Sequence, residues 1–166
     1  MDESDLDRDL KTFCRTITGT NPILVPYEPT WWAKHNQCFD NVANQIFLRG
    51  GSRQLGWQFR RNPLDTSPSI LSAIHHAVWR SRDGRLVDIT PVDSSYLTKG
   101  DSIWCGLDNE ATLKLVPGFN VATGRPSRYF SSSQNREVQR QVHRLRELER
   151  AARDYERQVA ASSSAR

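Results

Sequence analysis

The sequence predicts an α+β fold in which a short helix carrying a cysteine packs against a small, mainly antiparallel sheet. Three observations lead to this expectation. Apolar residues recur at helical spacing in two N-terminal segments, 4–17 and 36–47. They alternate with polar residues across 55–59, which is typical of a strand. Further along, two short apolar runs flank Asp83-Gly84, a dipeptide typical of hairpin turns.

The first helix is expected to begin at Ser4, a residue type that caps helices, and to end at Gly19. Cys14 lies on its apolar stripe and is therefore interpreted as a small core residue. The stretch 22–29 is expected to be irregular and leads into Trp31-Trp32. The stripe consists of Leu6, Leu10, Phe13, Cys14 and Ile17.

The second helix is expected to begin at Asn36, another capping residue, and to stop at Gly50-Gly51. This start places Cys38 in the first turn of the helix. One stripe of the helix is expected to be buried against the sheet. That stripe consists of Phe39, Val42, Ala43, Ile46 and Phe47.

The strands are predicted from short apolar runs between turn residues. A loop over 63–68 separates the first strand from a hairpin whose turn surrounds Asp83-Gly84. The expected strands are 55–59, 74–80, 86–90, 103–107 and 112–116.

The C-terminal part of the chain has a different composition. Residues 118–134 are rich in Gly, Pro, Ser and Asn and are expected to form a linker. Residues 137–158 contain no Gly or Pro and carry one narrow apolar face, which predicts a long amphipathic helix. The spacing of that face resembles a short coiled-coil seam, so the helix could dimerise, bind a partner or fold back on the domain. The face consists of Val138, Val142, Leu145, Leu148, Ala152, Tyr155 and Val159.

Three units follow from these patterns: an α+β domain at 1–130, a linker with the amphipathic helix at 131–160, and a disordered tail at 161–166. No apolar run approaches the roughly 20 residues that span a bilayer, and the acidic N-terminus lacks the features of a secretory signal. Three cysteines without paired spacing favour a reduced, cytoplasmic setting, with signal-independent secretion as an alternative. The net charge of +4 does not by itself indicate nucleic-acid binding, and the mixed-sign charges of the C-terminal helix argue against it.

Three residues together have the chemistry of a catalytic triad. Cys38 lies at a helix N-terminus, where unpaired N–H groups and the helix dipole favour a thiolate. His75 and His76 lie on the first hairpin strand, and Asp88 lies on the returning strand. A carboxylate beside a histidine fixes its tautomer and stabilises the imidazolium. The alternative is that Cys38 is a small buried residue and the hairpin holds a structural histidine.

Only one of the two histidines can share a face of the sheet with Asp88, because side chains alternate along a strand. A two-residue turn at Asp83-Gly84 pairs Trp79 with Asp88 and selects His75. A three-residue loop that includes Arg82 pairs Val78 with Asp88 and selects His76. Turn statistics favour the first register.

A family resemblance favours His76. Gln37-Cys38-Phe39 resembles the Gln-Cys-Trp of transglutaminase-like enzymes, with Phe in place of Trp. The segment 76–79, His-Ala-Val-Trp, is similar to the His-Val-Trp or His-Ala-Trp around their base, with one extra residue. The segment 88–91, Asp-Ile-Thr-Pro, matches their Asp-x-Thr-Pro. His-Ala-Val also resembles the corresponding motif of papain-like proteases, which share the core fold, and the resemblance covers 36–91.

The resemblance implies a papain/transglutaminase-like core and a Cys–His–Asp mechanism on amide or acyl bonds, without a cofactor. Members of the superfamily act as thiol proteases, deamidases or transglutaminases, so the expected substrate is a protein or peptide-like amide. Cys38, His76 and Asp88 are the expected catalytic residues. Gln37, Trp31, Trp32 and His75 are further candidates for binding substrate or oxyanion.

Two other interpretations remain open at this point. His35 and Cys38, together with His75 or His76 and Asp88, could form a zinc site. The chain could instead be a non-catalytic interaction protein that uses its C-terminal helix, through self-association or a coiled-coil partner.

Overall fold

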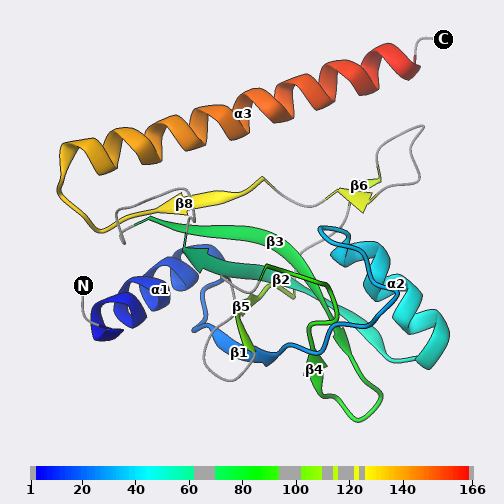
Figure 1. The fold of residues 1–166 in the computed structure, drawn as a ribbon. Coiled ribbons are helices and arrows are strands. Elements are labelled where there is room, and N and C mark those ends of the chain that lie inside the picture. The colour runs from blue at the N-terminus through cyan, green and yellow to red at the C-terminus, as the bar shows by residue number, and fades with distance from the viewer. Residues whose placement is uncertain are drawn as a thin grey trace.

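The structure is a computed structural model that describes residues 3–61, 70–93, 102–109, 114–115, 122–123 and 126–164. These residues form helices and antiparallel sheet. The predicted α+β class is confirmed (Figure 1). The helices are α1 (Glu3–Thr18), α2 (Cys38–Arg49) and α3 (Arg136–Ser164). The strands are β1 (Ile23–Pro26), β2 (Ser52–Arg61), β3 (Leu71–Arg80), β4 (Leu86–Val87), β5 (Ser102–Leu107), β6 (Lys114–Leu115), β7 (Ala122–Thr123) and β8 (Arg128–Phe130).

The main sheet has the strand order β1-β5-β2-β3-β4, and β8 pairs with β3. All of these strand pairs are antiparallel. The two ends of this order also meet, because the Asp88 N–H donates to the carbonyl oxygen of Pro26 and the Glu28 N–H donates to that of Asp88, both at 2.9 Å. The sheet therefore curls until its first and last strands touch.

Both short helices pack on the same face of β2 and β3. Leu10, Phe13 and Cys14 of α1 are buried with Phe59 and other residues at one end of these strands. At the other end, α2 packs against residues that include Ala77, Leu55 and Trp79. Figure 1 shows α1 and α2 at opposite ends of the sheet. Cys14 is fully buried, as predicted.

The hairpin between β3 and β4 has the longer of the two predicted loops. Trp79 pairs with Val87 and Arg80 with Leu86, so Arg82, Asp83 and Gly84 form the loop. Gly84 has φ 88°, a left-handed conformation that glycine adopts without steric cost. The Ser81 N–H donates to the Arg85 carbonyl oxygen at 2.9 Å and closes the loop. This register continues to a pairing of Val78 with Asp88, although β4 ends at Val87 because Asp88 turns toward β1.

Helix α2 ends at Arg49, before Gly50, as expected, but its start and its buried stripe differ from the expectation. It begins at Cys38, with Gln37 as the capping residue, whereas Asn36 has φ 59° and lies outside the helix. Phe47 was expected in the buried stripe, but it is 90% exposed. The reason is geometric: five residues after Val42, Phe47 lies about 140° around the helix from the buried face. The polar residues Asn41 and Gln45 are buried in its place.

Other local expectations also need correction. The stretch 22–29 is not wholly irregular, because it contains β1, which pairs with β5. Within the expected strand 112–116, the structure describes only β6, which pairs with β7 in a separate two-stranded sheet. The expected loop 63–68 lies outside the described residues.

The expected linker contains a strand of the main sheet. β8 pairs with the start of β3, with Leu71 opposite Phe130. Helix α3 then passes over β8, as Figure 1 shows, and buries Val138 and Val142 against Ile70. The helix continues to Ser164, so the expected disordered tail is helical over most of its length. No helix in the described ranges is long and apolar enough to cross a membrane.

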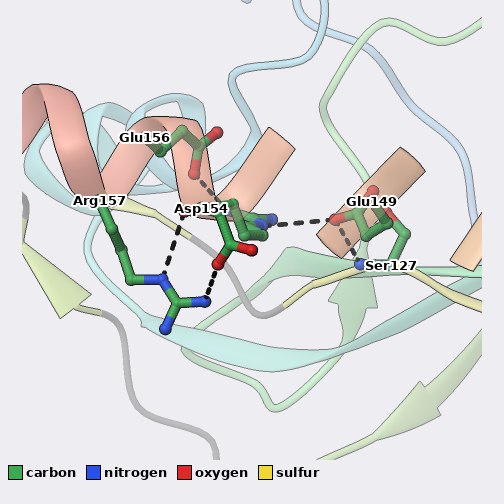
Figure 2. A network of polar contacts seen from close by, with 6 residues as sticks. Ser127, Glu149, Asp154, Glu156 and Arg157 are labelled. Carbon is green, nitrogen blue, oxygen red and sulfur yellow. Dashed lines mark hydrogen bonds and ion pairs between the residues drawn. The ribbon is translucent and has the colours of Figure 1, made fainter. Parts of the chain in front are cut away.

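The apolar face predicted for α3 divides into two parts. Val142 is 2% exposed, whereas Leu148 is 58% and Tyr155 is 68% exposed. Beyond Leu145 the contacts of the helix with the domain become polar. Figure 2 shows the distal network, in which the Ser127 N–H donates to a Glu149 carboxylate oxygen at 3.0 Å.

Replacing Val142 by Ala should lower the free energy of unfolding by about 1–3 kcal/mol, because it leaves a cavity against Ile70. Leu148→Ala on the same helix is the matched control. It should change the free energy by less than about 0.5 kcal/mol, since Leu148 is mostly exposed. Urea denaturation of the full chain measures both values. Equally small effects would contradict the packing of α3 on the domain.

Candidate functional site

Cys38 is the first residue of α2 and lies at the junction between the helix and the sheet. Its side chain is 7% exposed and packs with Val42, Ala77, Val87 and Ile89. The Asn41 N–H donates to the carbonyl oxygen of Gln37 at 2.8 Å, which begins the helical hydrogen bonding one residue before Cys38. The thiol is therefore carried by the helix N-terminus, as the sequence predicted.

His76 and Asp88 form a buried hydrogen bond. Nε2 of His76 lies 2.9 Å from Oδ2 of Asp88, and the two residues are 5% and 0% exposed. The second carboxylate oxygen, Oδ1, accepts the Thr90 N–H at 2.9 Å. Both oxygens of this buried carboxylate thus have partners, which offsets much of the cost of burying a charge. The three-residue hairpin loop is what places Asp88 on the His76 side of β3.

The environment of His76 raises its pKa well above 6.5. Burial by itself disfavours the imidazolium and would lower the pKa. The negative charge of Asp88, the Cys38 sulfur and side-chain hydrogen bonds with both residues outweigh burial. Since Nε2 is held by Asp88, Nδ1 is the ring nitrogen left to interact with Cys38. The three predicted triad residues therefore lie together.

Asn41 connects the helix that carries Cys38 to the segment that carries Asp88. Its Nδ2 donates to Oγ1 of Thr90 at 3.3 Å and to the carbonyl oxygen of Lys34 at 2.8 Å. Its Oδ1 accepts the Lys34 N–H at 3.0 Å. Asn41 is one turn after Cys38, so these bonds fix the position of the thiol relative to Asp88. The sequence analysis missed Asn41, because a lone Asn inside a helix usually faces solvent.

A cleft of about 430 Å³ opens over Cys38 and His76. A cleft of this size falls within the usual range for small-molecule and substrate sites. Its walls come from α2, β2, β3 and the segments before α2 and after β4. They consist of His35, Asn36, Cys38, Phe39, Gln58, Arg60, Ile74, His75, His76, Thr90, Pro91, Val92 and Asp93.

Gln58 is a second cleft residue that the sequence analysis missed. It lies on β2 between Trp57 and Phe59, so the alternation of apolar and polar residues predicts that its side chain faces solvent. β2 is a central strand, however, with β5 on one side and β3 on the other, and Gln58 is only 3% exposed. No hydrogen-bond partner for its Nε2 lies among the described residues. Because polar residues alternate with apolar ones along β2, the sequence carries no signal that distinguishes Gln58 as a buried residue.

The other predicted site residues occupy different positions. His75 lines the cleft and is 4% exposed, with its ring against those of Phe39 and Trp57. Trp32 packs beside the cluster that holds Cys38. Trp31 is 95% exposed, and neither Trp31 nor Gln37 lines the cleft. The exposure of Trp31 makes it a poor oxyanion donor, because such donors act in sites that exclude water.

The zinc interpretation is not supported by the geometry. His35 is exposed, while Asp88 is fully buried and already bonded to His76 and Thr90. Within the described ranges, no group of three or more His, Cys, Asp and Glu residues is arranged to hold a metal ion.

Comparison of the chain with protein-family models, with curated proteins and with solved structures gave no match.

The Asp88→Asn change should lower the pKa of His76, because it removes the charge that opposes burial. A raised folded-state pKa stabilises the fold fully below the unfolded value of about 6.5, and this stabilisation is lost as pH rises through the folded-state value. The stability difference between wild type and Asp88→Asn should therefore be larger below about pH 6.5 than above the folded-state pKa of His76. NMR titration of the imidazole measures the pKa of His76, and urea denaturation in each of the two pH ranges measures the stability difference. A difference in stability independent of pH would contradict it.

Proposed function

We propose that the protein is a cysteine-dependent hydrolase or acyl transferase that acts on an amide or acyl bond through Cys38, His76 and Asp88. The observation that carries the proposal is the buried His76–Asp88 hydrogen bond beside a helix-N-terminal cysteine, at the base of a cleft. Nucleophile, base and orienting group in mutual contact are what covalent catalysis by a thiol requires.

The raised pKa of His76 supports its assignment as the proton carrier. A raised pKa favours the imidazolium form, and an imidazolium is a common partner of a nucleophilic thiolate. Asp88 fixes the ring by accepting a hydrogen bond from Nε2–H, which leaves Nδ1 for the Cys38 sulfur. The bonds of Asp88 to Thr90 and to the backbone of β1 prevent the carboxylate from turning away.

The reaction proceeds in two steps. The Cys38 sulfur attacks the carbonyl carbon, a C–S bond forms, and the π electrons move to the oxygen. When the oxyanion collapses, the C–N bond breaks and His76 protonates the leaving amine. Water or a second amine then attacks the thioester, loses a proton to His76 and displaces the Cys38 thiolate. Hydrolysis, deamidation and acyl transfer share this path and differ in the group that leaves and the group that resolves the thioester.

We propose that the domain has a papain/transglutaminase-like core. The motifs in 36–91 imply a cysteine at the N-terminus of a helix packed on an antiparallel sheet, and here His76 lies on β3 and Asp88 directly follows β4. The three cysteines are free thiols, which suits the reducing cytoplasm that we propose as the protein's location. We propose a protein or peptide-like amide as the substrate.

A second role is favoured by the distal part of α3. Leu148 and Tyr155 remain exposed on a helix whose first turns are docked on the domain. We propose that this part contacts a partner or a second copy of the chain, in addition to the chemistry at Cys38.

Iodoacetamide at near-neutral pH should label Cys38 before the other two cysteines, as measured by mass spectrometry of the native protein. Burial raises the pKa of Cys14 and of Cys105, and neither residue lines the cleft. Both thiols serve as internal controls. Equal labelling of all three, or an inert Cys38, would rule out the nucleophile assignment.

His76→Ala should reduce the labelling rate of Cys38 by at least about tenfold, because general-base groups contribute about 10²–10⁴-fold to rate. His75→Ala should have a smaller effect, since His75 faces Phe39 and Trp57. Circular dichroism confirms that both variants fold. A loss confined to His75→Ala would reverse the assignment of the base.

A further inference from the structure

Gln58 is a buried amide whose nitrogen has no described protein partner. The side chain is 3% exposed, and its Nε2 makes no hydrogen bond to any described residue. Buried polar groups in folded proteins almost always have a partner, because an unmade hydrogen bond is not compensated by water. At the wall of a cleft, such a nitrogen is a donor that a bound ligand can reach.

Gln54, on the same strand, shows how a buried glutamine is normally accommodated. It is 7% exposed, and its Nε2 donates to the carbonyl oxygen of Leu55 at 2.8 Å and to Oδ1 of Asn109 at 3.0 Å. Its Oε1 accepts a hydrogen bond from Arg80 at 2.5 Å. Gln54 has a structural network, and Gln58 lacks the corresponding donor contact.

The strand register places Gln58 next to the proposed catalytic base. His76 pairs with Gly56 and Ile74 pairs with Gln58, so the side chains of His76 and Gln58 share one face as diagonal neighbours. Gly56, directly opposite His76, carries no side chain. β5 pairs with β2 on its other side, with Cys105 opposite Gln58, and holds the strand in place. Cys38, His76 and Gln58 all line the same cleft.

We propose that Nε2 of Gln58 donates a hydrogen bond to the carbonyl oxygen of the acyl group that Cys38 attacks. This role rests on the function proposed above. As the C–S bond forms, the π electrons move to that oxygen, and the N–H of Gln58 stabilises the developing negative charge without transferring its proton. The terminal amide torsion of glutamine is soft, so a small rotation suffices to aim the donor. Gln58 thereby takes the oxyanion role for which the exposed Trp31 is unsuited.

Two reagents that react with the same sulfur separate this role from a structural one. Acylation of Cys38 by p-nitrophenyl acetate passes through an oxyanion. Disulfide exchange with methyl methanethiosulfonate does not, because the thiolate attacks sulfur. The release of p-nitrophenolate and the mass of the modified Cys38 peptide report the first rate, and mass spectrometry reports the second. Cys38→Ser supplies the background.

Gln58→Met should slow acylation of Cys38 by about 10²-fold, the effect of removing one oxyanion donor, and leave disulfide exchange unchanged. Gln54→Met is the matched control and should leave both rates at the wild-type level. Gln58→Met should also be at least as resistant to urea as wild type, because it replaces an unsatisfied amide by an apolar group of similar size. Gln58→Leu repeats the test with a second apolar side chain.

The outcomes are distinguishable. An unchanged acylation rate in Gln58→Met, or an equal fall in both reactions, overturns the role of Gln58 while the proposed function stands. A wild-type Cys38 that reacts with neither reagent overturns the proposed function and this inference together. Unfolding of both Gln58 variants would identify the amide as structural and also overturn the inference.

Discussion

The hydrogen bonds of Asp88 are the constraint on which the rest of this structure depends. The backbone of this one residue joins β1 to the last strand of the sheet, through Pro26 and Glu28. Its side chain, which is fully buried, bonds His76 with one oxygen and Thr90 with the other. A buried carboxylate is costly unless its oxygens have hydrogen-bond partners, and here His76 and Thr90 are those partners. Asp88 therefore closes the sheet through its backbone and orients His76 through its side chain.

Helix α2 is held against this closed sheet at both ends. Asn41 joins its first turn to Thr90, and Nε1 of Trp79 donates to the carbonyl oxygen of Gly50 at 2.9 Å at its other end. These contacts set the position of Cys38 relative to His76. Two of the buried residues of this helix, Asn41 and Gln45, are polar. Polar groups buried beside a cleft contribute less to stability than apolar packing would, and they are typical of functional sites.

The C-terminal helix packs on the domain through apolar side chains over only part of its length. Its first turns, with Val138 and Val142, cover Ile70 and complete the core beside β8. Further along, polar contacts such as Ser127 with Glu149 replace apolar ones, and Tyr155 faces solvent. Proximal and distal parts of one continuous helix therefore have different energetic roles, although their sequence pattern is uniform. The packed part of the helix therefore ends within the helix itself, at a point that the amino-acid composition does not reveal.

The sequence by itself determined the elements whose signals are local. Helical spacing in α1, strand alternation in β2 and a helix-N-terminal Cys38 are properties of neighbouring residues, as is the burial of Cys14 on its stripe. Tertiary structure decided what depends on partners distant in the chain. The turn dipeptide allowed two registers, and only the three-residue loop placed His76 rather than His75 beside Asp88. Gln58 lies on the same face of the curled sheet as Cys105, which is buried with Val78. Strand alternation cannot reveal whether this second face of a strand is covered.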